Sequence, residues 1–187
     1  KIKFMVVNVE TNLITTYGLS EFDTLQYDTS LVINELLGLQ GVNFERALIF
    51  NPGQGYLPVA LDKIASIKEI TLMDRDLQSL KTSERNLRLN GLSESKIRVT
   101  HGSDLLANTD LKYDLVLGIL EEKDPQDFNS LLFEQSILKL NVGGILILGS
   151  GSTPITRIEK LSKKYKDIYV VKREKRKGSS VIIINKK

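Results

Sequence analysis

The sequence predicts a doubly wound α/β fold with a mostly parallel sheet of seven strands. From residue 47 onward, short apolar runs alternate with segments of helical periodicity, as expected when crossover helices join parallel strands. The first run, at 47–50 (ALIF), is apolar throughout, which is typical of a strand buried on both faces of its sheet. Only a short basic turn separates the last two apolar runs, so these two strands are expected to pair antiparallel and close the sheet as a hairpin.

The first 27 residues are predicted to form a β-hairpin extension in front of this core. Strands are expected at 3–9 and 13–16, with the turn at 10–12 (ETN). Asp28 is a suitable N-cap for the helix that follows, which should end at Gly38. The chain therefore reads as one domain, 1–187, made of the extension at 1–27 and the core at 28–187.

The core elements follow in order along the chain. A helix at 57–65 follows the first strand, and the next helix begins near Leu77 and ends at Asn90-Gly91, a typical C-cap. Pro125 and Pro154 each stand where the first turn of a helix accepts proline. The predicted strands lie at 47–50, 69–73, 96–100, 113–118, 144–148, 168–172 and 180–184.

Composition limits the function classes. The chain has 187 residues, no cysteine and one histidine, so thiolate chemistry, disulfides and histidine-based metal clusters are not expected. No apolar run is long enough to span a membrane, and a cytoplasmic location is expected. Between Arg157 and Lys187, twelve Lys/Arg stand against three Asp/Glu. This basic region either contacts RNA phosphates or forms a solvated, lysine-rich terminus.

Polar residues and glycines gather where the first three core strands end, which is where doubly wound folds bind ligands. Two glycines separated by one residue let the backbone turn tightly and approach a ligand closely. An aspartate at the end of the next strand can accept bonds from ribose hydroxyls, and a polar pair after the third can meet an adenine edge. These predicted cofactor residues are Asn51, Gly53, Gln54, Gly55, Asp74, Arg75, Ser103 and Asp104.

Four segments resemble the S-adenosylmethionine-dependent methyltransferases: 73–76 (MDRD), 86–92 (NLRLNGL), 99–104 (VTHGSD) and 113–116 (YDLV). The chain is most similar to the methyltransferase small domain group, which includes small-subunit ribosomal RNA guanine methyltransferases, and the resemblance extends over nearly the whole sequence. It implies a Rossmann-like methyltransferase fold, S-adenosylmethionine as cofactor and RNA, ribosomal RNA in particular, as acceptor.

The sequence departs from this family at two loops. Asn51 stands where the family usually has an acidic residue that anchors the methionine part of the cofactor, and Leu57 replaces the third glycine. After the fourth core strand, family members that methylate exocyclic amines carry Asn-Pro-Pro-aromatic, but this chain reads GILEEKD at 118–124, with Ile119 at the asparagine position. Catalytic candidates are thus limited to Gly118, Ile119 and Glu121, and Glu121 is either a general base or a solvated loop residue.

Three hypotheses follow. The first is a methyltransferase acting on RNA, with Gly53 and Gly55 admitting the cofactor, Asp74 holding its ribose and Asp104 meeting its adenine. The second is an inactive methyltransferase-like scaffold that binds RNA or protein. The third is a nicotinamide-dependent oxidoreductase, which the incomplete glycine pattern and the final hairpin disfavour. The sequence leaves the oligomeric state open.

Overall fold

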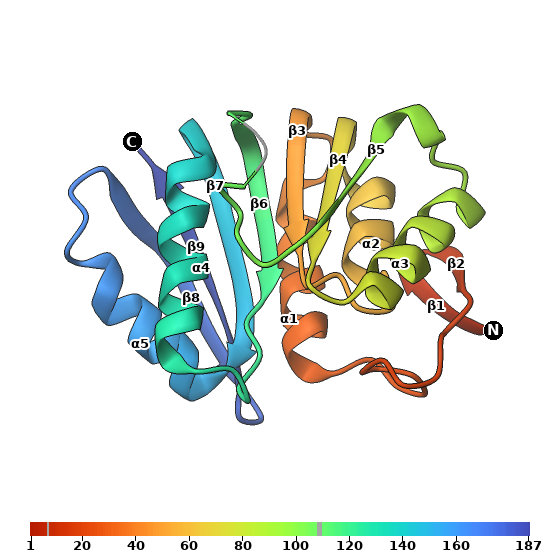
Figure 1. Ribbon diagram of the computed structural model, residues 1–187, viewed down its shortest axis with the longest axis horizontal. Helices are drawn as coiled ribbons and strands as arrows, with labels where there is room; N and C mark the ends of the chain where they lie inside the picture. The colour runs from red at the N-terminus through yellow and green to blue at the C-terminus, as the bar shows by residue number, and fades with distance from the viewer. Residues whose placement is uncertain (7, 108–109) are drawn as a thin grey trace.

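The computed structural model describes residues 1–6, 8–107 and 110–187, and a sheet of seven strands forms its centre (Figure 1). The strands are β3 (Asn43–Phe50), β4 (Ser66–Asp74), β5 (Ile97–His101), β6 (Tyr113–Ile119), β7 (Leu140–Gly151), β8 (Ile168–Arg176) and β9 (Ser179–Lys186). Their order across the sheet is β5-β4-β3-β6-β7-β9-β8. The first five strands are parallel, while β9 runs antiparallel to both β7 and β8. The predicted fold is confirmed.

Helices cover both faces of this sheet. They are α1 (Tyr27–Leu36), α2 (Tyr56–Ile64), α3 (Leu77–Leu89), α4 (Gln126–Lys139) and α5 (Ser152–Ser162), with short 3₁₀ turns at Leu37–Leu39 and Glu94–Lys96. Helices α1, α2 and α3 pack on one face, and α4 and α5 on the other. No helix in the described part of the chain is long and apolar enough to cross a membrane.

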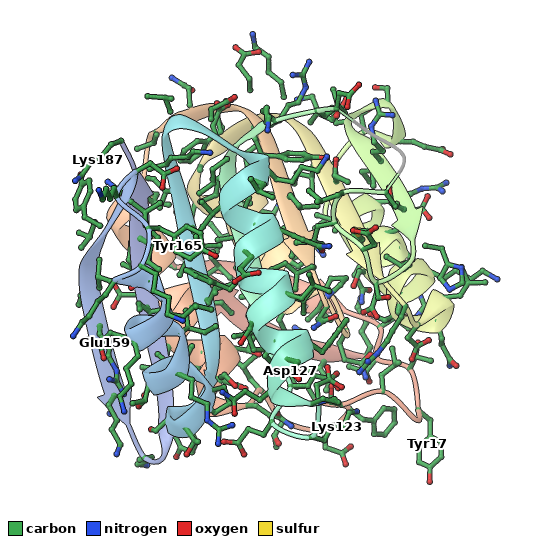
Figure 2. All side chains as sticks on the ribbon, turned by 60° about the vertical axis from the view of Figure 1, so that its left-hand side comes forward. Tyr17, Lys123, Asp127, Glu159, Tyr165 and Lys187 are labelled. Carbon is green, nitrogen blue, oxygen red and sulfur yellow. The ribbon has the colours of Figure 1, made fainter. Side chains whose placement is uncertain are left out.

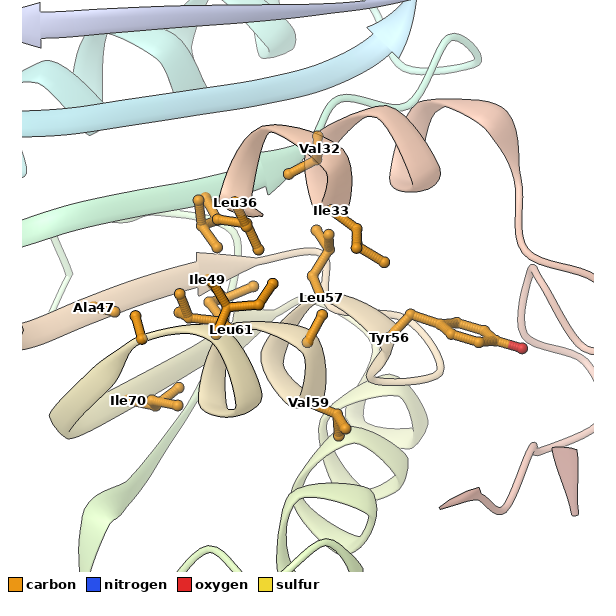
Figure 3. Close-up of a cluster of buried hydrophobic side chains, with 14 of the residues drawn as sticks. Val32, Ile33, Leu36, Ala47, Ile49, Tyr56, Leu57, Val59, Leu61 and Ile70 are labelled. Atoms are coloured by element: carbon orange, nitrogen blue, oxygen red, sulfur yellow. The ribbon is translucent and has the colours of Figure 1, made fainter. Parts of the chain in front are cut away.

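The central strand β3 explains why the sheet is buried on both sides. Successive side chains of a strand point to opposite faces, so Ala47 and Ile49 enter the core beneath α1 and α2 (Figure 3), while Leu48 and Phe50 enter the core beneath α4 and α5. All four side chains are at most 2% exposed. A fully buried residue of the size of Leu contributes about 1.5–3 kcal/mol to stability, so the unbroken apolar run is what places β3 at the centre.

The N-terminal extension is a hairpin, as predicted, but its turn was predicted wrongly. Strands β1 (Ile2–Val6) and β2 (Val9–Leu13) pair antiparallel, and the turn lies between Val6 and Val9, where Asn8 takes a φ of 62°. Asparagine tolerates this left-handed conformation better than most residues. The predicted turn at 10–12 lies inside β2, where Thr11 is buried and its hydroxyl donates to the Phe4 carbonyl oxygen at 2.7 Å. Val7 lies outside the described residues.

Two further boundaries differ from the predictions. Helix α1 begins two residues earlier than expected, with Gln26 as N-cap, and Asp28 lies in its first turn, where it accepts a bond from the backbone N–H of Thr29. The basic turn expected between the last two strands is shorter than predicted, because β8 continues to Arg176. The turn itself consists of Lys177 and Gly178, both with positive φ.

Asparagine side chains fasten the hairpin to the core. The Asn86 amide, on α3, accepts from the Ile14 N–H at 2.9 Å and donates to the Ile14 carbonyl oxygen at 3.2 Å. One turn later, Asn90 makes the equivalent pair of contacts with the backbone of Asn12. The segment that leaves β2 is thereby directed past the carboxyl ends of the parallel strands, toward α1 (Figure 1).

Candidate functional site

The glycine loop between β3 and α2 is held against α3. Gly53 and Gly55 have φ of 55° and 92°, a conformation that other residues adopt only with strain. A Cβ atom at Gly55 would lie 3.0 Å from the Cα of Ser83, so this glycine also allows α3 to approach closely. The Gly53 carbonyl oxygen accepts bonds from the hydroxyls of Ser83 at 3.0 Å and Ser79 at 3.4 Å.

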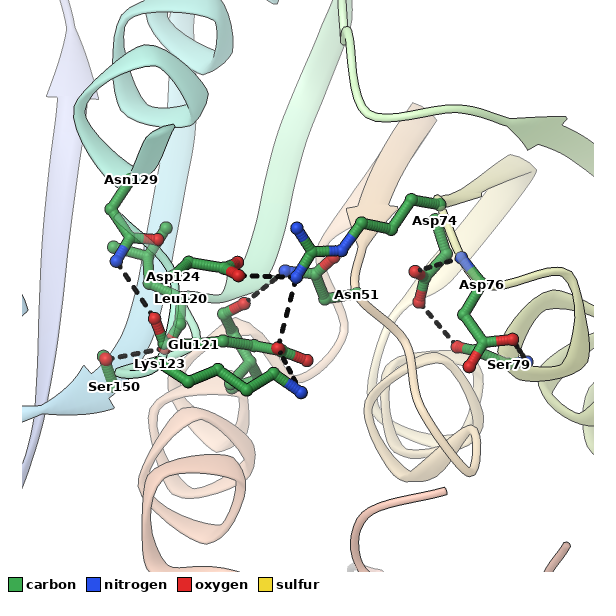
Figure 4. Close-up of polar contacts among 12 residues, drawn as sticks. Asn51, Asp74, Asp76, Ser79, Leu120, Glu121, Lys123, Asp124, Asn129 and Ser150 are labelled. Atoms are coloured by element: carbon green, nitrogen blue, oxygen red, sulfur yellow. Dashed lines mark hydrogen bonds and ion pairs between the residues drawn. The ribbon is translucent and has the colours of Figure 1, made fainter. Parts of the chain in front are cut away.

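Asp74 ends β4 next to this loop (Figure 4). One carboxylate oxygen accepts from the backbone N–H of Asp76 at 2.9 Å, and the other accepts from the Ser79 hydroxyl at 2.6 Å. Burial raises the pKa of Asp74, while the bonds from Ser79 and Asp76 act in the opposite direction. Each oxygen retains a lone pair for a further donor, so Asp74 is a fixed acceptor of the kind that a pair of hydroxyls requires.

A cleft of about 220 Å³, open to solvent, lies over the ends of β3, β4 and β5. Four of the predicted cofactor residues line it, namely Asn51, Asp74, Arg75 and Ser103. The cleft is completed by Phe50, Met73, Gly102, Leu105, Phe128 and Leu132. It combines a few polar groups with apolar walls, as small-molecule sites usually do.

Two predicted residues have other partners in this structure. Gln54 is fully buried and binds the N-terminal segment, because its amide accepts from the Thr16 N–H at 2.8 Å and donates to the Thr16 carbonyl oxygen at 3.0 Å. Asp104 does not line the cleft, and its carboxylate accepts from the Gln135 amide at 2.7 Å. The predicted contact of Asp104 with adenine stays a prediction.

Arg75, one of the cleft residues, meets the loop that follows β6, where Figure 4 labels its partners Asp124 and Glu121. Its guanidinium lies 2.6 Å from a carboxylate oxygen of Asp124, 3.4 Å from Glu121, and 5.3 Å from the ring centre of Phe128. The hydrogen bond to Asp124 is the main cause that raises the pKa of Arg75. The prediction named neither Asp124 nor Phe128 as a site residue, although the acidic residues at 121, 122 and 124 were a signal for a basic partner.

The loop after β6 is held by its backbone. Gly118 must be glycine, since a Cβ atom there would lie 2.0 Å from the Phe50 ring. The Ile119 carbonyl oxygen accepts from the Asn51 side-chain amide at 2.8 Å. Glu121 pairs with Lys123 at 2.8 Å as well as with Arg75. None of these contacts presents an acceptor pair for an amine in the manner of Asn-Pro-Pro-aromatic.

Behind this loop lies a second hollow of about 280 Å³, between the beginnings of α4 and α5. Two acceptor atoms in its lining residues, Asp124 Oδ2 and Asn129 Oδ1, are buried and have no hydrogen-bond partner among the described residues. Arg157 and Glu122 contribute to the same lining. Within the described ranges, no group of three or more His, Asp or Glu side chains is arranged to hold a metal ion.

Comparison with known protein families gives a match over most of the chain. The family model described as the methyltransferase small domain matches residues 11–177. The chain belongs to this family. Comparison with curated protein sequences finds no match.

Solved structures share the methyltransferase fold at low sequence identity. The 16S rRNA methyltransferase RsmC of T. Thermophilus, in complex with AdoMet and guanosine, superposes with a TM-score of 0.81 at 18% identity and covers 100% of this chain and 50% of its own. This chain thus spans half the length of RsmC. A ribosomal protein methylase from Lactobacillus delbrueckii subsp. bulgaricus gives a TM-score of 0.72 at 20% identity, over 87% of this chain and 80% of its own.

A third structure is the N-methyltransferase NodS from Bradyrhizobium japonicum in complex with S-adenosylhomocysteine. Its TM-score is 0.65 at 14% identity, and the alignment covers 84% of this chain and 85% of NodS. By their names, these proteins are an rRNA methyltransferase, a methylase of a ribosomal protein and an N-methyltransferase, so proteins with different acceptors share this fold.

Proposed function

We propose that this protein is an S-adenosylmethionine-dependent methyltransferase that acts on RNA. The observation that carries the proposal is Asp74, fixed by Ser79 and the Asp76 N–H at the edge of a cleft over the ends of β3, β4 and β5. Membership of the methyltransferase small domain family supports the reaction class.

The residues of the cleft fit the adenosyl part of the cofactor. Asp74 would accept the ribose hydroxyls, Ser103 and Gly102 offer a polar edge for adenine, and Phe50 and Leu132 form apolar walls. The enclosed space of the cleft is no larger than a water molecule, so the cofactor requires a wider cleft than the one in this structure. Arg75 narrows it, and its side chain is 46% exposed, so a change of rotamer would widen it at the cost of a partly exposed ion pair.

S-adenosylmethionine would supply an activated methyl group, and the protein's own contribution is to position the acceptor. Positioning alone supplies a large part of the rate in such transfers. Because Ile119 replaces the asparagine that orients an exocyclic amine, we do not assign such an amine as the acceptor. Glu121 would first have to leave Lys123 and Arg75 before it could accept a proton.

Two exposed features of the surface support an RNA acceptor. Tyr17 is 84% exposed and meets Phe22 edge to face at 5.6 Å between ring centres, so its ring can stack on a base. Tyr17 and Lys123 project from the same edge of the molecule (Figure 2). The basic region from Arg157 onward adds positive charge for phosphates.

The first experiment is calorimetric titration with S-adenosylmethionine and S-adenosylhomocysteine. Micromolar binding is expected, and Asp74→Ala should weaken it about tenfold or more, since each charged hydrogen bond contributes about 1.5–3 kcal/mol. Asp127→Ala, a carboxylate on the first turn of α4, is the control. If neither ligand binds the wild-type protein at millimolar concentration, the methyltransferase assignment is wrong and the inactive scaffold is favoured.

The second experiment identifies the acceptor. The protein is incubated with radiolabelled S-adenosylmethionine and with either ribosomal RNA or ribosomal proteins, each purified from ribosomes. Label in RNA is expected, and label in protein alone would contradict the RNA assignment while leaving the methyltransferase assignment intact.

A further inference from the structure

Asn51 offers no negative charge to the methionine part of a cofactor. Its side chain is uncharged, and its amide nitrogen donates to the Ile119 carbonyl oxygen at 2.8 Å, which ties the end of β3 to the end of β6. Family members usually have a carboxylate at this position. A cofactor that carries an α-ammonium group therefore needs an acidic partner from elsewhere in this chain.

Glu21 brings a carboxylate to the glycine loop from the N-terminal segment. That segment passes the carboxyl ends of the strands between β2 and α1 (Figure 1), and Gln54 holds it to the loop through Thr16 and Leu19. A Cβ atom built on Gly53 would have one neighbour within 4 Å, the Glu21 Oε2 atom at 3.9 Å. Glu21 thus faces the one side of Gly53 that the absent side chain leaves open.

The backbone of Glu21 is strained. Its φ is 61°, in the left-handed region that glutamate rarely adopts. Such strain is found preferentially at functional sites. This conformation directs the Glu21 side chain inward, where its Oε1 atom accepts from the Gln26 N–H at 2.9 Å.

The surroundings of Glu21 hold no compensating cation. The groups that face it are the Thr29 hydroxyl, the Asp28 carboxylate and the Tyr56 hydroxyl, and no ion pair of Glu21 occurs among the described residues. Burial raises the pKa of Glu21 to about 7. The Tyr56 hydroxyl, on the first residue of α2, is buried without a hydrogen-bond partner in the described part of the chain. A half-buried carboxyl group and a hydroxyl without a described partner, both beside a glycine loop, form a site for a hydrogen-bond-donating cation.

We propose that Glu21 holds the α-ammonium group of the cofactor's methionine part, in place of the acidic residue that the family has at the position of Asn51. The inference rests on the proposed function, because it assigns part of the same cofactor site. The N-terminal extension is then a component of the cofactor site rather than a separate appendage.

A pH dependence follows. In the free protein Glu21 carries a proton for part of the time near neutrality, and an ammonium group beside it favours the ionised form. Binding therefore releases a proton below about pH 7. The affinity for a cofactor with an α-ammonium group should rise with pH up to about 7, by as much as tenfold per pH unit, and then level off.

The test compares two ligands that differ in the amino-acid part. S-adenosylhomocysteine carries the α-ammonium group, and 5′-methylthioadenosine lacks it. Glu21→Gln should lower the affinity for S-adenosylhomocysteine about tenfold or more and remove the pH dependence of that affinity between pH 5.5 and 7.5. The affinity for methylthioadenosine should stay unchanged. Glu94→Gln, an exposed glutamate far from the loop, is the matched control.

The outcomes separate this inference from the proposed function. If the wild-type protein binds neither ligand, the proposed function fails and the role of Glu21 falls with it. If it binds both but Glu21→Gln leaves the affinity for S-adenosylhomocysteine unchanged, the role of Glu21 alone is overturned. An equal loss of affinity for both ligands would show that Glu21 acts by supporting the start of α1, and this result would also overturn the proposal.

Discussion

The carboxylate of Asp124 lies 2.6 Å from the guanidinium of Arg75, and the ion pair joins the cleft that Asp74 borders to the loop after β6. Asp124 is nearly buried, with 6% of its side chain exposed, whereas Arg75 is about half exposed. The pair therefore has a fixed carboxylate and a mobile partner. If Arg75 obstructs the cleft, its exposed side chain is the one that moves when a ligand enters.

We expect Asp124→Asn to speed the entry of ligand. Loss of an ion pair of about 0.5–1 kcal/mol should raise the association rate constant of S-adenosylhomocysteine about two- to fivefold in stopped-flow measurements. Lys123→Gln removes the other cation at Glu121 without changing Arg75 and is the control. An unchanged or slower association in Asp124→Asn would show that Arg75 does not obstruct the cleft.

The pattern of apolar runs was sufficient to predict the sheet, and Asp74 was recognised because a carboxylate at a strand end lies at the ligand-binding edge. The contacts between distant loops were not predictable in the same way. Arg75 meets Asp124, and Glu21 meets Gly53, only after the strands have assembled. Neither pair has a characteristic spacing in the sequence. Leu57, which replaces a family glycine, is a buried core residue beneath α1 (Figure 3), a role that its position beside the glycine loop did not reveal.

The stability of the protein should depend on pH through Glu21, independently of any ligand. The pKa of Glu21 rises from 4.5 to about 7 on folding, so between these values the folded protein holds a proton that the unfolded chain has released. The free energy of unfolding then falls as pH rises, by at most about 1.4 kcal/mol per pH unit, and less with solvent screening. Urea unfolding from pH 5 to 8 should show this slope in the wild-type protein and a smaller slope in Glu21→Gln. Equal slopes in the two proteins would contradict the burial of this carboxyl group.

Gly118 tests the packing at the end of β6. In Gly118→Ala the new methyl group would overlap the Phe50 ring, and overpacking of a core site commonly costs about 1–3 kcal/mol. We expect a loss of at least about 2 kcal/mol in urea unfolding. Gly38→Ala is the matched control, because nothing lies within 4 Å of a Cβ atom there and its φ is not positive. A fully stable Gly118→Ala protein would mean that Phe50 can leave its position at no cost.

The basic hairpin of β8 and β9 offers a test of RNA binding that does not depend on catalysis. Lys172 is already paired with Glu35 at 2.6 Å, whereas Lys175 and Arg176 are exposed and make no ion pair among the described residues. If these two contact phosphates, replacing both with Gln should weaken RNA binding and reduce the slope of log affinity against log salt by about 0.7–0.9 per lost contact.

The control for this double substitution is Lys68→Gln, which also removes a positive charge but lies on β4, near the opposite end of the sheet from the cleft. Fluorescence anisotropy with a labelled ribosomal RNA fragment, between 50 and 300 mM salt, measures the slope of log affinity against log salt for the wild-type protein and each variant. A reduced slope in Lys175→Gln/Arg176→Gln, with no change in Lys68→Gln, would place RNA on the hairpin. Equal slopes in all three proteins would assign the basic residues to solvation, because a charge that contacts no phosphate releases no counterion when RNA binds.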